Sequence, residues 1–81
     1  MTAANGDVVL VDSTGAITVT MTESANAKIT VKSLCGETIT IQGASGTIDG
    51  QASIQITSQY EAYTFVCDGS DWFIIGHFAN P

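Results

Sequence analysis

The sequence contains no arginine and only two lysines, Lys28 and Lys32, in 81 residues. Eight acidic residues bring the formal net charge to −6 at pH 7. A protein with so few cations repels a phosphate backbone or an anionic lipid surface instead of attracting it. The composition therefore argues against nucleic acid and against membranes as partners.

Long hydrophobic runs and a targeting segment are also missing from the sequence. A transmembrane helix needs about 18 or more consecutive apolar residues, and no stretch of the sequence approaches this length. Residues 1–7 include neither a basic segment nor an apolar run, so they do not match a secretion signal. We expect a soluble protein that carries no secretion signal.

Cysteine and histidine are scarce, with two cysteines, Cys35 and Cys67, and one histidine, His77. This set is too small for a disulfide framework or for a Cys/His zinc site. A single Cys35–Cys67 bridge stays open as an alternative, and two buried thiols in reduced form are the favoured interpretation. Because a domain of this size buries only about 60% of the surface of its unfolded chain, we expect neighbouring chains to help stabilise it.

The residue patterns typical of catalysis are absent as well. Nucleophilic catalysis needs a base close to the nucleophile, and no motif surrounds His77. Ser45 does not lie in a nucleophile elbow, because Thr47 stands where that motif requires glycine. A glycosidase with two facing carboxyl groups stays open, although 81 residues leave little room for a cleft. We therefore predict a protein that is not an enzyme, with no catalytic and no cofactor-binding residues.

Three aspartates, Asp49, Asp68 and Asp71, are the candidates for a calcium site. Asp-Gly pairs between strands are typical turn residues, so we interpret these aspartates as parts of turns and predict no bound metal. A trimer leaves one alternative open, in which three His77 side chains meet a metal on a threefold axis. A solvated or hydrogen-bonded surface histidine is the favoured interpretation of His77.

The residues that are plentiful, Thr, Ile, Val, Ser and Gly, favour strands over helices. Apolar and hydroxylated residues alternate, as in Ile17 and Val19 against Thr18 and Thr20, and a period of two is typical of strands with one buried face. We predict an all-β fold, a single domain over residues 1–81, built as a β-sandwich, a barrel or a β-helix-like wrap. The eight predicted strands lie near residues 7–11, 16–22, 27–33, 37–42, 46–49, 52–57, 62–67 and 71–77.

The run from Trp72 to Ile75 breaks this alternation because it is apolar on both faces. Such a strand needs cover on both sides, and a small sheet rarely buries both of its faces within one chain. The domain's own core provides one cover. We expect a partner subunit to provide the other, with a loop of the same chain as the alternative. Aromatic residues are common at interface centres, so the predicted subunit interface consists of Trp72, Phe73, Ile75 and Phe78.

Several segments, taken together, resemble a module that recurs in bacteriophage virion proteins. In chain order they are residues 28–32 (KITVK), 37–41 (ETITI), 47–50 (TIDG), 59–60 (QY) and 68–75 (DGSDWFII). The similarity extends over roughly residues 7–77. Such modules occur in tail fibres, tail spikes and small head or tail accessory proteins. The resemblance implies a β-rich, commonly homotrimeric unit, while the His-X-His pair found at metal-bearing spike tips is missing from this sequence.

The resemblance implies two classes of function. In the first, the protein is a capsid decoration or cement subunit, or a similar accessory subunit, that stabilises the particle. In the second, it is a tail-fibre or spike module that contacts the host cell surface. We expect the first, because nothing besides the module is present in the sequence. The expected partners are other copies of the chain in a trimer and virion proteins such as the major capsid or tail protein. The expected location is the virion, assembled in the host cytoplasm.

Overall fold

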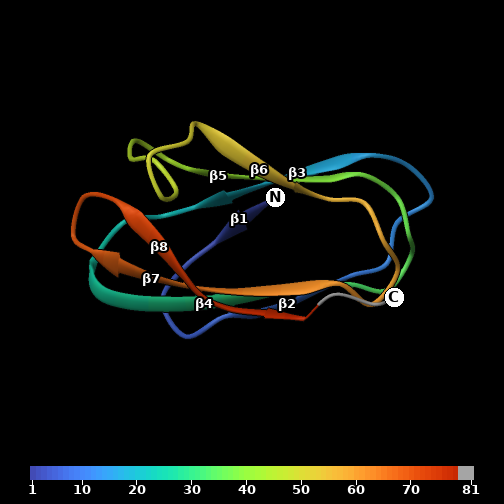
Figure 1. Ribbon diagram of the computed structural model, residues 1–81, viewed down its shortest axis with the longest axis horizontal. Coiled ribbons are helices and arrows are strands. Elements are labelled where there is room, and N and C mark those ends of the chain that lie inside the picture. Colours follow the sequence, from blue (N-terminus) through green and yellow to red (C-terminus); the bar gives the residue numbers. More distant parts are fainter. Residues whose placement is uncertain (79–81) are drawn as a thin grey trace.

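Eight strands connected by loops make up the computed structural model, which describes residues 1–78 (Figure 1). The predicted all-β fold class is confirmed. Within residues 1–78 there is no helix with the length and hydrophobicity needed to cross a bilayer. The strands are β1 (Thr2–Ala3), β2 (Val8–Val11), β3 (Ile17–Met21), β4 (Ala25–Ser33), β5 (Ile39–Gly43), β6 (Ser53–Ile56), β7 (Ala62–Asp68) and β8 (Trp72–Phe78).

The strands form two four-stranded sheets that face each other like the layers of a sandwich (Figure 1). Sheet A has the order β1-β3-β5-β6, and sheet B has the order β2-β4-β7-β8. The first five strands alternate between the sheets and pair in parallel, so Thr20 lies beside Gln42, 22 positions later. The last three strands pair antiparallel. The fold is therefore sandwich-like, and its first half is wound in the β-helix-like manner that the sequence left open.

The inward-facing residues of both sheets form one hydrophobic core. Val19 of β3 and Ile29 of β4 come from opposite sheets, and neither is exposed. Phe65 and Trp72 are the largest of the fully buried side chains. Burial of a side chain of this kind stabilises the fold by about 1.5–3 kcal/mol. The alternation of residue types thus directs one face of each sheet into the core.

Seven of the eight predicted strands are confirmed, and the strand predicted at residues 46–49 is wrong. Ile48 forms only isolated bridges, and it exchanges two backbone hydrogen bonds of 2.8 Å with Gln51. Between them, Asp49 and Gly50 have φ angles of 48° and 84°, as in a tight two-residue turn with both central residues left-handed. A turn therefore takes the place of the strand. Strand β1 is absent from the predicted set because two residues show no periodic pattern.

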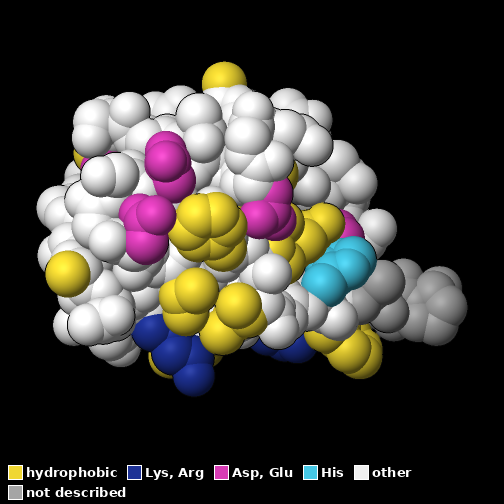
Figure 2. All heavy atoms as spheres, turned by 60° about the vertical axis from the view of Figure 1, so that its left-hand side comes forward, with side chains coloured by type: hydrophobic (Ala, Val, Ile, Leu, Met, Phe, Trp, Pro, Cys, Tyr) yellow, Lys and Arg dark blue, Asp and Glu magenta, His cyan; other side chains and the backbone are white. Residues whose placement is uncertain are grey.

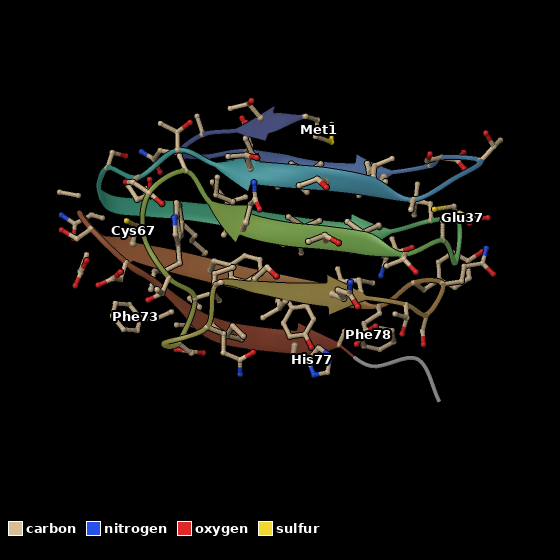
Figure 3. The ribbon with its side chains drawn as sticks, turned by 90° about the horizontal axis from the view of Figure 1, so that it is seen from above. Met1, Glu37, Cys67, Phe73, His77 and Phe78 are labelled. Atoms are coloured by element: carbon tan, nitrogen blue, oxygen red, sulfur yellow. The ribbon has the colours of Figure 1, made fainter. Side chains whose placement is uncertain are left out.

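The two cysteine thiols are free and lie far apart. Cys35 follows the end of β4, where Lys32 pairs with Ala62, whereas Cys67 lies at the other end of β7. Figure 3 shows Cys67 at one end of the sandwich and Glu37, two residues after Cys35, at the other. A disulfide requires Cα atoms within about 7 Å, so the bridge is excluded. Cys67 is buried and Cys35 is half-buried.

Candidate functional site

The outer surface of sheet B exposes several large apolar side chains to solvent. Val8 and Leu10 of β2 are 68% and 58% exposed, and Phe73, Ile75 and Phe78 of β8 are 40%, 58% and 53% exposed. Sheets with one solvated face usually place polar residues on it. Contiguous apolar surface of this kind typically marks a site of interaction with another molecule.

The strand register arranges this surface in rows that run across the sheet. Between the rows, the hydroxyl oxygens of Thr30 and Thr64 lie 3.2 Å apart. One row is Lys28, Val66 and Phe73, and another is Leu10, Lys32, Ala62 and Phe78. We term the surface formed by Val8, Leu10, Lys28, Lys32, Val66, Phe73, Ile75 and Phe78 the lysine face. Figure 2 shows hydrophobic side chains grouped beside the lysines, with carboxylates above them.

Both lysines of the protein lie on the lysine face, and no acidic residue belongs to it. The Lys32 ammonium donates a hydrogen bond to the carbonyl oxygen of Tyr60 at 3.1 Å and lies 5.0 Å from the ring centre of Phe78. Within residues 1–78 the one ion pair joins His77 and Glu61. The two ammonium groups therefore have no carboxylate partner in the described part of the chain, although eight acidic residues are present.

Three aspartates hold loops in place at one end of the sandwich. The carboxylate of Asp68 accepts two N–H groups of its own turn at 2.9 Å. Asp71 accepts the N–H of Thr47 at 3.0 Å, and Asp49 accepts that of Ile74 at 3.3 Å. The hydrogen bond from the N–H of Asp71 contributes most to lowering the pKa of Asp68. The interpretation of these aspartates as turn residues is confirmed.

His77 is engaged at the surface of the single chain. Its Nε2 lies 2.9 Å from a carboxylate oxygen of Glu61, and its ring stacks on Tyr63 with 4.2 Å between ring centres. Burial, and then the charge of Glu61, raises the pKa of Tyr63. Among residues 1–78, no three His, Cys, Asp or Glu side chains are grouped so that they could hold a metal ion. His77 is a hydrogen-bonded surface residue, as the favoured interpretation predicts.

The four residues of the predicted subunit interface occupy two different environments. Phe73, Ile75 and Phe78 belong to the lysine face. Along β8, Trp72 and Ile74 face the core while Phe73 is exposed, and the pairing of β7 with β8 skips Ile75. Trp72 has no exposed surface within the single chain. It offers nothing for a partner to contact, and we leave it out of the interface proposed below.

The interface predicted from the sequence does not include the residues that β2 and β4 contribute to the lysine face. Two signals point to them. The run from Val8 to Val11 is apolar on both faces, and Lys28 and Lys32 lie four positions apart in one strand, which places both on the same side. The pairing of β2 beside β4 brings these residues together, and no local pattern indicates that pairing.

The lysine face is the surface of the described chain with the features of a binding site. No family model and no curated protein matches the chain significantly.

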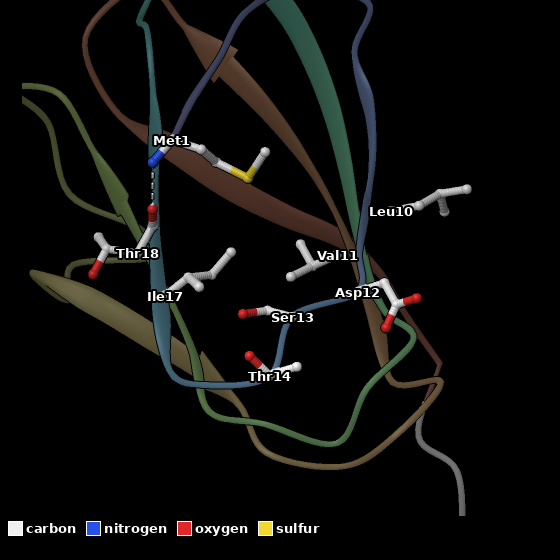
Figure 4. A pocket seen from close by; sticks show the side chains of 8 residues that line it. All are labelled: Met1, Leu10, Val11, Asp12, Ser13, Thr14, Ile17 and Thr18. Atoms are coloured by element: carbon white, nitrogen blue, oxygen red, sulfur yellow. Dashed lines mark hydrogen bonds between the residues drawn. The ribbon is translucent and has the colours of Figure 1, made fainter.

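An open pocket of about 590 Å³ lies beside β2 and the start of β3 (Figure 4). Its lining combines the apolar side chains of Val11 and Ile17 with the carboxylate of Asp12 and the hydroxyl of Ser13. This hydroxyl donates a hydrogen bond to the carbonyl oxygen of Gly15 at 2.8 Å. No histidine lines the pocket, so the lining does not place a histidine base beside the serine.

Glu23 fastens the loop between β5 and β6 over Trp72. Its carboxylate accepts hydrogen bonds from the N–H and the hydroxyl of Ser45, both at 3.1 Å, from the N–H of Gly46 at 3.2 Å, and from the indole N–H of Trp72 at 2.9 Å. Burial raises the pKa of Glu23, but the hydrogen bonds that its carboxylate accepts, led by those from Gly46 and Trp72, together outweigh this effect and leave the pKa below its ordinary value. The ionised carboxylate thus holds the loop and the indole together.

We expect Glu23→Gln to lower the free energy of unfolding by about 1–2 kcal/mol at neutral pH, because hydrogen bonds to a charged acceptor are lost. The pKa of Glu23 is lower in the folded protein, so its stabilising contribution is complete above the ordinary pKa of 4.5 and disappears as the pH falls through the lowered value. Urea unfolding between pH 7 and pH 3 should show the wild type converging on the variant. Asp12→Asn, an exposed acid in another loop, is the control. A stability difference that does not change with pH would contradict this role of Glu23.

Proposed function

We propose that the protein is a non-enzymatic structural subunit of a bacteriophage particle, a capsid decoration or cement protein or a similar accessory subunit. The observation that supports this most is the lysine face, where five large apolar side chains are at least 40% exposed. Burial of such surface against another chain is favourable by roughly 25 cal/mol per Å². The resemblance of residues 7–77 to phage virion modules supports the proposed location, which is the virion. Virions are assembled in the host cytoplasm.

The proposed assembly is a homotrimer that buries the lysine face between its subunits. Phe73, Ile75 and Phe78 remain from the predicted interface, and Val8 and Leu10 extend it across the sheet. The trimer stabilises the particle by binding a larger virion protein such as the major capsid or tail protein. Nucleic acid and membranes are not among the proposed partners, because a net charge of −6 repels both.

We expect light scattering at micromolar concentration to show a species of three 8.4 kDa chains. Phe73→Ser combined with Ile75→Ser should convert it to a monomer, because the apolar contact area is lost while the core is untouched. Circular dichroism should show an unchanged fold. Gln55→Ser, an exposed change on the outer face of sheet A, should leave the trimer intact. A wild type that scatters as a single chain would refute the proposed assembly.

The location in the particle can be tested directly on virions. Negative-stain images of virions labelled with an antibody to the protein should show label on the head, or along the tail for an accessory subunit there. Absence of label on purified virions would refute the structural role. Label confined to the tail tip would favour adhesion to the host.

Adhesion is a second candidate, which the outer face of sheet A favours. The side chains on this face are uncharged and display hydroxyl and amide groups. Gln42 donates a hydrogen bond to the hydroxyl of Thr20 at 3.3 Å. Such groups suit the hydroxyls of neutral sugars on a host surface, and a glycan array tests for this binding. The residues that face outward here are Thr2, Thr18, Thr20, Thr40, Gln42, Ser53 and Gln55.

A further inference from the structure

The charges of the lysine face restrict how copies of this chain can pack. If two lysine faces met each other, Lys28 and Lys32 of both copies would enter one interface that holds no carboxylate. Desolvating unpaired charges costs several kcal/mol. A contact between the lysine face and a different, acidic surface of the next copy avoids this penalty.

The chain presents an acidic surface of the required kind at one end of the sandwich. We term it the acidic end, and it comprises Glu23, Asp49, Asp68 and Asp71 on the loops around 23–24, 44–52 and 68–71. In Figure 2 several carboxylates lie close together above the apolar patch. Asp68 and Asp71 hold their turns through Oδ1, and Asp49 does so through Oδ2. Since a carboxylate accepts hydrogen bonds on both oxygens, each can hold its turn and still accept from a lysine.

We propose that the homotrimer is a ring in which the lysine face of each subunit contacts the acidic end of the next. This inference rests on the proposed trimer and names its contact surfaces. A contact between two different surfaces is heterologous, and a ring of such contacts closes under rotation. In each interface Lys28 and Lys32 approach the carboxylates of the neighbouring copy, and Leu10, Phe73 and Phe78 exclude water around them.

The shape of the molecule agrees with this arrangement. The lysine face is a broad side of the sandwich, whereas the acidic end is one of its short sides (Figures 1 and 2). A contact between a side and an end turns each copy relative to the previous one, as closure of a ring requires. Each interface also brings the two lysines of one copy to the four carboxylates of the next. The ring therefore keeps a net negative charge and an acidic exterior, which favours solubility.

A set of charge variants tests the contact, with the oligomeric state measured by light scattering and analytical ultracentrifugation. Lys28→Glu combined with Lys32→Glu should raise the trimer dissociation constant by roughly tenfold or more. Ser24→Lys combined with Ser70→Lys should also raise the dissociation constant, because it places positive charge at the acidic end. Both serines are exposed there, and their replacement spares the carboxylates that hold the turns. The chain with all four substitutions should associate more tightly than the one with the two lysine reversals alone, since each new glutamate can then pair with a new lysine of the next copy. Raising the salt concentration should weaken the wild-type trimer.

Control variants separate the possible failures. Thr18→Glu combined with Gln55→Glu adds negative charge to the outer face of sheet A and should leave the trimer intact. Circular dichroism and the fluorescence of Trp72 report whether each variant folds. A wild-type trimer that tolerates the lysine reversals, or a fourfold variant that folds but associates no more tightly than the variant with the lysine reversals alone, overturns the proposed contact and leaves the trimer standing. A monomeric wild type overturns the trimer itself.

Discussion

Trp72→Ala should lower the free energy of unfolding by about 3–5 kcal/mol, the usual loss when a large aromatic side chain is removed from a core. The ring of Trp72 is fully buried and heads the set of large buried side chains. Its removal leaves a cavity and takes one hydrogen-bond donor from Glu23. Since domains of this kind are stable by only about 5–15 kcal/mol, the variant should be close to unfolding at room temperature. Urea unfolding followed by far-ultraviolet circular dichroism measures the loss.

Trp72→Phe is the matched control because it keeps an aromatic ring in the core, leaves a smaller cavity than alanine does, and removes the indole N–H. We expect it to lose about 1–2 kcal/mol, the usual effect of a hydrogen bond to a charged acceptor. Both variants must be compared at one protein concentration, since assembly shifts apparent stability. An unchanged melting temperature for Trp72→Ala would show that the ring does not support the core.

Gly46→Ala should destabilise the protein by about 1–3 kcal/mol, the range for overpacking of a well-filled site. A Cβ atom at Gly46 would overlap with the backbone carbonyl of Ser70, and it would also lie 3.0 Å from a carboxylate oxygen of Asp71. A backbone carbonyl cannot rotate away as a flexible side chain can. Relief therefore requires the loop between β5 and β6 to shift, which disturbs the hydrogen bond from the Gly46 N–H to Glu23.

Gly15→Ala is the control for Gly46→Ala. A Cβ atom at Gly15 meets no atom within 4 Å, and its φ lies outside the left-handed region. We expect a change of less than about 0.5 kcal/mol, as for most surface substitutions. Thermal unfolding of the two variants at the same concentration should separate them clearly. Equal melting temperatures would contradict the close approach of the loop to Ser70.

Trp72, Gly46 and Glu23 act at one place, the acidic end and the part of the core directly behind it. The hydrogen bonds of Glu23 hold the β5–β6 loop, and Asp71 holds Thr47 of the same loop. The stability of this region therefore positions the carboxylates that, in the proposed ring, receive the lysines of the next subunit. A loosened loop should weaken the trimer as well as the fold.

The sequence by itself determined the fold class and most strands, because alternation of apolar and hydroxylated residues is a local property. Ile17 and Val19 must share one face of an extended chain whatever lies beside them. The turns at Asp49-Gly50 and Asp68-Gly69 are equally local, since both glycines have positive φ angles that favour this residue. The apolar run from Trp72 to Ile75 likewise marked a strand with an exposed apolar side.

Only the tertiary structure decided which residues share a surface. Leu10 lies beside Lys32 because β2 pairs in parallel with β4, and Glu23 holds Trp72 across 49 positions of sequence. The same apolar run sends Trp72 into the core and Phe73 to the surface, and periodicity alone does not say which is which. The physical reason is that register and sheet order depend on packing between distant segments, so the lysine face and the acidic end exist only once the two sheets have closed on each other.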